Sequence, residues 1–577
     1  MLPLLLLTTL SLALVGASPI STRATDTAPR IPQVTIIPST SNGEGITLTG
    51  IAYPQFKQDV YLGIPFAEPP VEDLRFRPPQ SKVYNSSSFS AIVQPPACLQ
   101  NPNTSLSGNS GISEDCLYLN VYTPEGWGPQ SPPIPVMVWI YGGSYQAGAT
   151  SSYNATALMA RGMATNRPFI FVAVAYRLNI LGFGYGAEIA ANNAANLGLR
   201  DITLGLQWVQ DNIWAFGGDP TQVTAFGQSA GAISISLLYL NRNTTLFRSA
   251  IMESGAQSVA PLGPTATTWQ VGYDLLTDTS NSTTVVGSAA YNQSTFECLK
   301  ALPAPALLNA TLQVYCEHMT ELTGSFIYGP SIDGDLIPDS PHTMLQEGKF
   351  AQIPFISGNC LDEGTSFVPT SVTNETQVGL YIEAAEPVHP NVSIIGDLFQ
   401  LYPNNASLGS PYGTGNETFG FAPEFKQIAA IVGDAQFQAN RRWFLEQARA
   451  HGQSDTWSYL WTEPPAGLAA YRGVAHSSEV YYVFGFTTLE TGYNASQVAL
   501  ASRVEDYWIN FAYYTDPNGP SGTTSNLTYW PAYGANSTML QFAAGNDTLI
   551  PDTYRKTQMD FFNGNPTAFN YRRSLYG

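Results

Sequence analysis

Apolar runs of strand length and apolar stripes of helical spacing alternate along the middle of the chain. Residues 134–141 and 169–176 are unbroken apolar runs as long as a buried strand, and each ends at glycine or a polar residue. Residues 194–216 instead repeat apolar side chains at roughly helical spacing and end at Gly217. This order predicts parallel strands whose connections cross over through helices.

The alternation continues toward the C-terminus. Further predicted elements are a strand at 223–226, a helix at 230–240, and strands at 353–357 and 456–461. Buried strands that alternate with helices predict an α/β fold, in which a mostly parallel sheet is covered on both faces. No internal repeat interrupts the pattern, and the only linker-like tract is residues 18–32, so we expect one domain over residues 33–577.

The N-terminus has the pattern of a secretory signal peptide. Residues 2–15 form an apolar run of 14 residues, too short to span a bilayer, and small residues follow up to Ala17. We therefore expect a signal peptide over residues 1–17, cleaved after Ala17 or Ser18, and a secreted protein. Because no Lys or Arg precedes the run, a membrane anchor is the alternative. No later run is long enough for a membrane span, and residues 570–577 lack the hydrophobic tail of a lipid anchor, so we expect no stable membrane anchoring.

Charge narrows the classes of partner. The 577 residues include 24 Lys plus Arg against 43 Asp plus Glu, which gives a net charge of −19 and a pI near 4.6. Lys and Arg form no cluster, so we expect no nucleic-acid partner, because phosphate binding needs a basic patch.

Cysteines and glycosylation sequons fit an oxidising compartment. Five cysteines suit two disulfides, and the simplest pairing joins Cys98 to Cys116 and Cys298 to Cys316 and leaves Cys360 free. No Cys-x-x-Cys or His-rich pair suggests a metal site, so we expect no metal and no cofactor. Candidate glycosylation acceptors, each in Asn-x-Ser/Thr without proline, are Asn85, Asn103, Asn154, Asn243, Asn281, Asn292, Asn309, Asn374, Asn391, Asn405, Asn416, Asn494, Asn526, Asn536 and Asn546.

A serine motif supplies the sharpest chemical signal. Residues 227–231 read Gly-Gln-Ser-Ala-Gly and lie between the predicted strand at 223–226 and the predicted helix at 230–240. A nucleophilic serine needs such a tight strand-to-helix turn to expose its hydroxyl, and the glycines let neighbouring elements approach closely. The position favours Ser229 as a nucleophile over an ordinary Gly/Ser turn.

A nucleophilic serine also needs a base, which follows it in the chain in sheet enzymes of this kind. All the histidines lie downstream of the serine motif: His318, His342, His389, His451 and His476. His451 ends a helical stretch, and His342 and His389 lie beside prolines in predicted loops. His476 lies in the loop after the 456–461 strand, and catalytic groups gather where such strands end, so it is the candidate base.

The acid and the oxyanion donors occupy equivalent strand ends. The loop after the 353–357 strand offers Asp362 and Glu363, and the local sequence does not choose between them. Oxyanion donors are expected from the amide after the nucleophile, Ala230, and from the turn at residues 141–145, Tyr-Gly-Gly-Ser-Tyr. Along the chain, the oxyanion turn comes first, and the nucleophile, the acid and the base follow in the order that this chemistry requires.

With these motifs the chain resembles the type-B carboxylesterase/lipase family, which includes cholinesterases and fungal extracellular lipases and has the α/β-hydrolase fold with a small antiparallel N-terminal portion. Residues 61–70 and 113–121 look like its two N-terminal signatures, and residues 212–220 lead into the serine motif as in the family. Residues 530–533 also fit, and the resemblance covers roughly residues 34–562.

The resemblance implies a serine esterase that hydrolyses small to medium carboxylic esters through an acyl-enzyme, with the ester as its small-molecule partner. It also assigns roles to matching residues: the triad Ser229, Glu363 and His476; oxyanion amides of Gly143, Ser144 and Ala230; a supporting serine, Ser254; and a first disulfide between Cys98 and Cys116.

The chain departs from the family pattern at three places. Ser144 stands where the family usually has a third glycine, which puts a side chain at the oxyanion hole. Gln228 replaces a glutamate of many relatives, which removes a negative charge beside the nucleophile and weakens attraction for cationic substrates. The loop between Cys98 and Cys116 is short, mostly polar and without tryptophan, unlike the apolar lid of the lipases or the choline-binding loop of cholinesterases.

Two alternatives remain open. A triacylglycerol lipase that acts on long-chain esters would need an apolar surface at the mouth of the site, which an insertion such as residues 261–310 would have to supply. A non-catalytic, cholinesterase-like binding protein is the less expected alternative, because all three triad positions are present.

Overall fold

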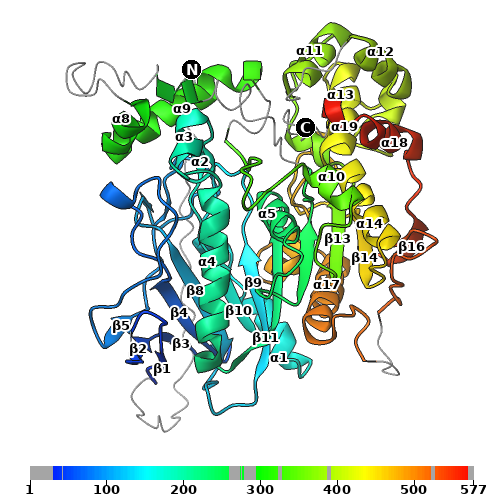
Figure 1. Cartoon of the computed structure of the whole chain (residues 1–577). Coiled ribbons are helices and arrows are strands. Elements are labelled where there is room, and N and C mark those ends of the chain that lie inside the picture. Colours follow the sequence, from blue (N-terminus) through cyan, green and yellow to red (C-terminus); the bar gives the residue numbers. More distant parts are fainter. Residues whose placement is uncertain are drawn as a thin grey trace, which may run out of the picture.

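The computed structural model describes residues 30–41, 43–258, 273–274, 276–277, 294–322, 328–385, 392–520 and 527–569. Figure 1 shows a central sheet with helices packed against it and a further group of helices at one end of the molecule. The predicted signal peptide at 1–17 lies outside the described residues, and so does most of the 18–32 segment.

Sixteen strands are present in the described part of the chain. They are β1 Gln33–Ile36, β2 Ile46–Thr49, β3 Ile51–Tyr53, β4 Gln58–Pro65, β5 Ser88–Ser90, β6 Ala97–Cys98, β7 Ile112–Ser113, β8 Tyr118–Pro124, β9 Ile134–Ile140, β10 Ile170–Val174, β11 Gly218–Gln228, β12 Ser249–Glu253, β13 Phe355–Cys360, β14 Thr456–Trp461, β15 Thr538–Phe542 and β16 Thr548–Pro551.

One 11-stranded sheet forms the centre, in the order β16-β15-β14-β13-β12-β11-β9-β10-β8-β4-β3. Neighbouring strands from β10 to β15 in this order pair in parallel, and the outer strands pair antiparallel. A smaller sheet joins β1 to β2 antiparallel and β2 to β5 in parallel. The parallel core brings the carboxyl ends of β9, β11, β13 and β14 to one edge, where such sheets bind their ligands. The predicted α/β architecture is confirmed.

The helices are α1 Thr156–Ala164, α2 Asn179–Phe183, α3 Ala187–Ala191, α4 Leu197–Asn212, α5 Ala230–Leu238, α8 Thr295–Ala301, α9 Ala304–Leu322, α10 Pro341–Gln346, α11 Glu375–Ala385, α12 Val392–Leu401, α13 Pro423–Gly433, α14 Ala439–Ala450, α15 Val480–Val483, α16 Phe486–Leu489, α17 Ala495–Tyr514, α18 Lys556–Gly564 and α19 Pro566–Phe569. The short turns used below are η2 Thr150–Ser152 and η4 Glu363–Ser366.

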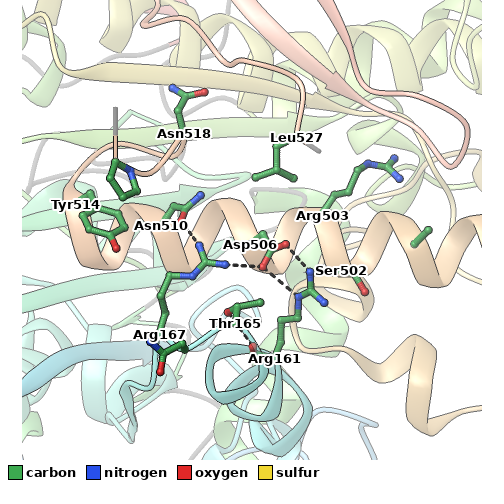
Figure 2. Close-up of a pocket in the computed structure, with 13 residues that line it drawn as sticks. Arg161, Thr165, Arg167, Ser502, Arg503, Asp506, Asn510, Tyr514, Asn518 and Leu527 are labelled. Carbon is green, nitrogen blue, oxygen red and sulfur yellow. Dashed lines mark hydrogen bonds and ion pairs between the residues drawn. The ribbon is translucent and has the colours of Figure 1, made fainter. Parts of the chain in front are cut away.

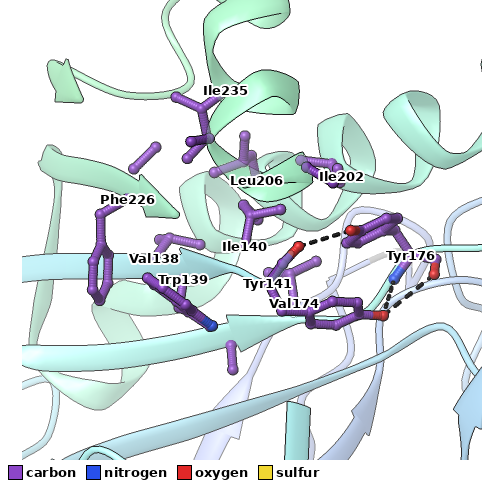
Figure 3. Packing of buried hydrophobic residues seen from close by; sticks show 14 of the residues in the cluster. Val138, Trp139, Ile140, Tyr141, Val174, Tyr176, Ile202, Leu206, Phe226 and Ile235 are labelled. Carbon is purple, nitrogen blue, oxygen red and sulfur yellow. Dashed lines mark hydrogen bonds between the residues drawn. The ribbon is translucent and has the colours of Figure 1, made fainter. Parts of the chain in front are cut away.

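The centre of the sheet is buried on both faces, because β9 and β10 are buried at every position. Successive strand side chains point to opposite faces, so Ile140 packs toward Ile202 and Leu206 of α4, whereas Trp139 lies on the other face (Figure 3). Trp139 contacts Phe484 at the end of α15, with ring centroids 4.8 Å apart, and α15 packs on α17. Helices therefore cover both faces, as the unbroken apolar strands require.

A second apolar cluster lies beside this core. It joins α11, α12 and α13 to α18 and α19, through residues such as Leu398, Phe425, Ile428 and Phe562. Figure 1 shows these helices together at one end of the molecule. The chain after β16 is thereby packed against the segment that follows Glu363.

Candidate active site

Ser229 occupies a strained turn between β11 and α5. Its backbone φ and ψ are 56° and −128°, outside the regions that most residues adopt, and the residue is 7% exposed. The flanking glycines are needed for space, since a Cβ on Gly227 or Gly231 would lie 2.5 or 2.0 Å from the carbonyl oxygen of Ile140. The close approach of β9 thus fixes the turn that presents the serine.

His476 and Glu363 are joined by a short hydrogen bond. His476 Nδ1 lies 2.5 Å from Glu363 Oε2, and Glu363 Oε1 accepts the Cys360 N–H at 2.7 Å. The rings of Phe367 and Phe437 pack against the imidazole, at centroid distances of 5.0 and 4.9 Å. With Nδ1 bonded to the carboxylate, the other ring nitrogen, Nε2, is left to act as the base.

Asp362 has a different role from its neighbour. Its Oδ1 accepts the Tyr412 N–H at 2.8 Å, and its Oδ2 accepts the Val474 N–H at 2.9 Å. Burial raises the pKa of Asp362, although these hydrogen bonds oppose the shift. Asp362 is therefore hydrogen-bonded to the backbone of the loop that carries His476, whereas Glu363 contacts the imidazole itself.

Gln228 directly precedes the candidate nucleophile and contacts the candidate base. Its Nε2 is 3.1 Å from His476 Nε2. Because an amide nitrogen only donates, this contact matches a neutral imidazole whose Nε2 accepts. Among the described residues no hydrogen bond joins Ser229 to His476, although both line the same cavity. Gln228 therefore contacts the imidazole nitrogen that is not bonded to Glu363.

The three predicted oxyanion amides carry no competing partner. Gly143 and Ser144 adopt φ of 121° and 56°, and Ala230 begins α5, at the positive end of the helix. None of these three N–H groups donates to another described residue. Ser144 adopts a positive φ, which favours glycine, so a residue with a side chain here takes the conformation for which the family usually has glycine.

Ser254 is linked to the site through Glu479, a residue that no sequence motif marks. Its Oγ donates to Glu479 Oε1 at 3.3 Å, and Glu479 is buried three positions after His476. The sequence signal that could have identified Glu479 is that it is a lone acidic residue at the start of an otherwise apolar helical stretch, α15.

Ser229, Gln228 and His476 line a cavity of about 460 Å³. Apolar and aromatic side chains form much of the remaining wall: Leu106, Tyr153, Phe367, Val480, Tyr481 and Phe486. A pocket of this size and lining accommodates a small organic ligand.

The loop closed by the first disulfide forms part of this wall. Cys98 and Cys116 are bonded, as predicted, and the loop between them supplies Ser105 and Leu106 to the cavity. Ser152 Oγ of η2 donates to the Leu106 carbonyl at 3.4 Å. The loop thus lines the same cavity as the candidate nucleophile.

The predicted Cys298–Cys316 disulfide is wrong, because Cys298 is a buried free thiol on α8. Helix α8 packs against α3, and burial together with the nearby Glu188 carboxylate of α3 raises the pKa of the Cys298 thiol. The side chain of Cys316 lies outside the described residues. Cys360 is also a buried free thiol, as the pairing scheme predicted.

The remaining histidines lie elsewhere. His342 is on helix α10 and not in the predicted loop, and its ring stacks on Trp443 with centroids 4.4 Å apart. His451 follows α14, as predicted, with its Nε2 3.0 Å from the Gln346 carbonyl. His389 and the side chain of His318 lie outside the described residues.

Every candidate glycosylation acceptor within the described ranges is exposed, which leaves each accessible to modification. Four candidates lie outside those ranges: Asn281, Asn292, Asn391 and Asn526.

A larger cavity of about 590 Å³ lies between α1 and α17 (Figure 2). Arg161 and Arg167 point at Asp506 and pair with it at 2.5 and 3.0 Å, and Arg503 pairs with Asp547 at 2.8 Å. The cavity wall contains no histidine or cysteine, and its charges largely pair with each other. This cluster joins α1 to α17 and is not a candidate for the chemistry above.

A mostly parallel sheet whose strand ends carry a strained serine turn, an oxyanion-type turn and a joined histidine and glutamate defines an α/β-hydrolase. The carboxylesterase family model matches residues 40–562. The chain belongs to the carboxylesterase family and is a carboxylic ester hydrolase.

Several fungal proteins are similar to this chain. Secreted lipase 1 of Botryotinia fuckeliana is 36% identical, over 89% of this chain and 90% of that protein. Lipase 2 of Geotrichum candidum is 32% identical, over 86% and 91%. The crystal structure of Aspergillus niger EstA has the same fold, with a TM-score of 0.79 at 24% identity over 93% of this chain and 99% of that one. Across the described residues, no helix is both long and apolar enough to span a membrane.

Proposed function

We propose that this chain is a secreted serine esterase that cleaves small to medium carboxylic esters by two-step acyl transfer. His476 takes the proton of Ser229 as the hydroxyl attacks the ester carbonyl, and Glu363 orients the imidazole and stabilises its cationic form. The hydrogen bond of 2.5 Å between His476 and Glu363, beside the strained Ser229 turn, is the observation that carries this proposal.

The oxyanion of each tetrahedral intermediate is stabilised by backbone N–H groups of Gly143, Ser144 and Ala230. These amides are unused in the described structure, so they need not break an existing hydrogen bond to serve. The alcohol leaves after the first step, and water, activated by His476, then hydrolyses the acyl-enzyme.

Two observations support the preference for smaller esters. The cavity of about 460 Å³ matches a small ligand better than a triacylglycerol with three long chains. The loop between Cys98 and Cys116 is short and mainly polar, unlike a long apolar lid, and Ser107 within it is buried against the protein.

A lipase is the second candidate, because the relatives named above are called lipases. At the cavity wall Leu106 and Tyr481 are each 39% exposed, so part of an apolar rim faces solvent. A lipase would use such a rim to contact an oil surface.

One pair of rates separates the two candidates. Initial rates would be compared on soluble p-nitrophenyl butyrate and on an emulsified long-chain triacylglycerol, with secreted, deglycosylated protein and with Ser229→Ala as the matched blank. Fast butyrate hydrolysis with little activity on the emulsion supports the esterase. A jump in rate when the long substrate forms an interface identifies a lipase, and no activity on either ester above the Ser229→Ala blank contradicts both.

Secretion and a single catalytic domain over residues 33–577 are part of the same proposal. Secretion is supported by the apolar N-terminal run at 2–15, by the disulfide between Cys98 and Cys116, and by the relatives that are named as secreted.

A further inference from the structure

A group of buried polar side chains, which we call the acid cluster, lies behind the His476–Glu363 pair. It consists of Glu253 at the end of β12, the adjoining Ser254, Cys360 at the end of β13, and Glu479 before α15. Each of the four is at most 1% exposed. The mechanism above uses none of them, yet two buried carboxyl groups in one cluster are costly unless their charges and donors are matched.

The donors in the cluster are distributed unequally. Glu479 receives two, from Cys360 Sγ at 2.8 Å and from Ser254 Oγ at 3.3 Å. Glu253 Oε1 receives one, from Trp508 Nε1 at 2.8 Å, and its Oε2 has no partner among the described residues. Since hydrogen-bond donors stabilise a charged carboxylate, this arrangement favours the negative charge on Glu479 and the proton on Glu253.

Electrostatics agree with this assignment. Burial, reinforced by the nearby Glu479, raises the pKa of Glu253 well above its usual range. Burial first, and then the charge of Glu363, raises the pKa of Glu479 to about 6, while His476 and the Cys360 hydrogen bond oppose that rise. The titratable groups that interact electrostatically with Glu479 are Glu253, Glu363, His476, Cys360 and Tyr459.

Cys360 connects this cluster to the triad. Its backbone N–H donates to Glu363 Oε1 at 2.7 Å, and its thiol donates to Glu479 Oε2 at 2.8 Å. One residue therefore holds two carboxylates that would otherwise repel each other. Burial and the two carboxylates Glu479 and Glu363 raise the pKa of the Cys360 thiol well above its usual value, so the thiol keeps its proton and remains a donor.

We infer that Glu479 and Cys360 are positioning residues of the catalytic site: Glu479 is a second anion that stabilises protonated His476, and the Cys360 thiol keeps Glu479 ionised. Glu253 is the neutral member of the cluster. The inference rests on the proposed function, because His476 must gain a proton during turnover for Glu479 to act on the rate.

The rate is expected to depend on pH through the charge of Glu479. As pH falls, protonation of Glu479 removes the second anion, and the rate falls with it. Removing the thiol donor makes Glu479 easier to protonate, so Cys360→Ala moves the acid limb of kcat/KM for p-nitrophenyl butyrate to higher pH. Cys360→Ser retains a donor and returns the limb toward the wild-type position.

A double-mutant cycle isolates this link. Glu479→Gln should lower kcat on the order of tenfold with KM within about twofold, since the lost interaction is with a charge formed during turnover. In the Glu479→Gln background, Cys360→Ala should no longer shift the acid limb. The matched control is Glu505→Gln, another buried carboxyl, whose pKa burial raises to about 8 and whose neighbours are Arg161 and Asp506; it should leave the limb in place.

Each variant is first checked by thermal unfolding and by fluorophosphonate labelling of Ser229. Wild-type kcat and an unshifted acid limb in both Cys360→Ala and Glu479→Gln would overturn the inference. So would equal shifts in Cys360→Ala and Cys360→Ser, which would indicate packing and not hydrogen bonding. A wild-type protein that fails to label at Ser229 would instead overturn the proposed function.

Discussion

Two serines that line the cavity, Ser144 and Ser229, have strained backbones. Both residues hold a φ of 56°, a positive value that costs a non-glycine residue roughly 1–3 kcal/mol. Both turns follow central strands, β9 and β11, that are held on two sides by parallel neighbours. The packed sheet maintains this strain where a hydroxyl and free amides must be presented together.

Gln228 is expected to set the response to substrate charge. Gln228→Glu restores a negative charge next to the nucleophile, so it should raise kcat/KM for butyrylthiocholine relative to an uncharged ester of the same size by up to roughly tenfold at low salt. Steady-state rates at two ionic strengths measure this ratio.

The control for that substitution is Gln228→Ala, which removes the amide contact with His476 without adding charge. It should leave the ratio near the wild-type value. A ratio that is unchanged in Gln228→Glu, or that rises equally in both variants, would contradict the electrostatic role.

At the level of elements, the sequence predicted several of the strands that consist mainly of apolar residues. The strand predicted at 456–461 has the same bounds as β14, and the helix predicted at 194–216 contains α4. It missed β12, Ser249–Glu253, because both end residues are polar and no apolar run of strand length remains. Those ends are buried because Ser249 Oγ bonds Thr224 Oγ1 at 2.9 Å and Glu253 bonds Trp508.

In the candidate site, too, local sequence identified some residues, and tertiary contacts decide the roles of others. Ser229 was predictable because it directly follows a recognisable strand, and His476 because it lies in the loop after one. The residues alone left Asp362 and Glu363 open, since only tertiary contacts separate their roles. The cluster around Glu479 and the free Cys298 were missed because both depend on which helices and strands pack together.

Helix α17 begins with a cap that is also a candidate glycosylation acceptor. Asn494 Oδ1 accepts the backbone N–H groups of Ser496 and Gln497, each at 3.0 Å, and Gln497 Oε1 accepts the Asn494 N–H at 3.1 Å. Asn494→Ala should therefore reduce stability by about 1 kcal/mol. Thermal unfolding of deglycosylated protein measures the change.

Asn494→Asp separates the cap from the sequon. Aspartate keeps the acceptor and favours the helix N-terminus, but it cannot be glycosylated, so its unfolding midpoint should match the deglycosylated wild type. Equal losses in the Ala and Asp variants would show that the cap does not stabilise α17.

At the scale of the molecule, one buried ion cluster joins α14 to the chain after β16. Asp552 accepts from Arg441 at 2.8 Å and from Arg442 at 2.6 Å, and Tyr533 donates a further hydrogen bond at 2.8 Å. Both arginines and Asp552 are at most 3% exposed. Burial alone would raise the pKa of Asp552, but the two guanidinium groups outweigh it and hold the pKa well below its usual value.

Asp552→Asn should destabilise the fold by roughly 3–5 kcal/mol, because two buried cations lose their partner. The depressed pKa gives the pH dependence: the contribution of the carboxylate is complete above its unfolded pKa, near 3.9, and is lost as pH falls from there toward the folded value. Denaturant unfolding between pH 3 and 7 should therefore show a weaker acid loss in Asp552→Asn than in the wild type.

Asp560→Asn is the exposed control for that substitution. Asp560 pairs with Lys556 at 2.7 Å, but both side chains are 52% exposed, so its removal should change stability by less than about 0.5 kcal/mol. Equal effects at Asp552 and Asp560 would contradict the claim that burial makes the Asp552 cluster important.

The most direct test of the account identifies the nucleophile. Intact protein would be treated with a fluorophosphonate and mapped by peptide mass spectrometry, alongside Ser229→Ala. We predict one label, on Ser229, and a loss of ester turnover in Ser229→Ala of about 10³-fold or more. Labelling of a different serine, or undiminished turnover in Ser229→Ala, would contradict the account.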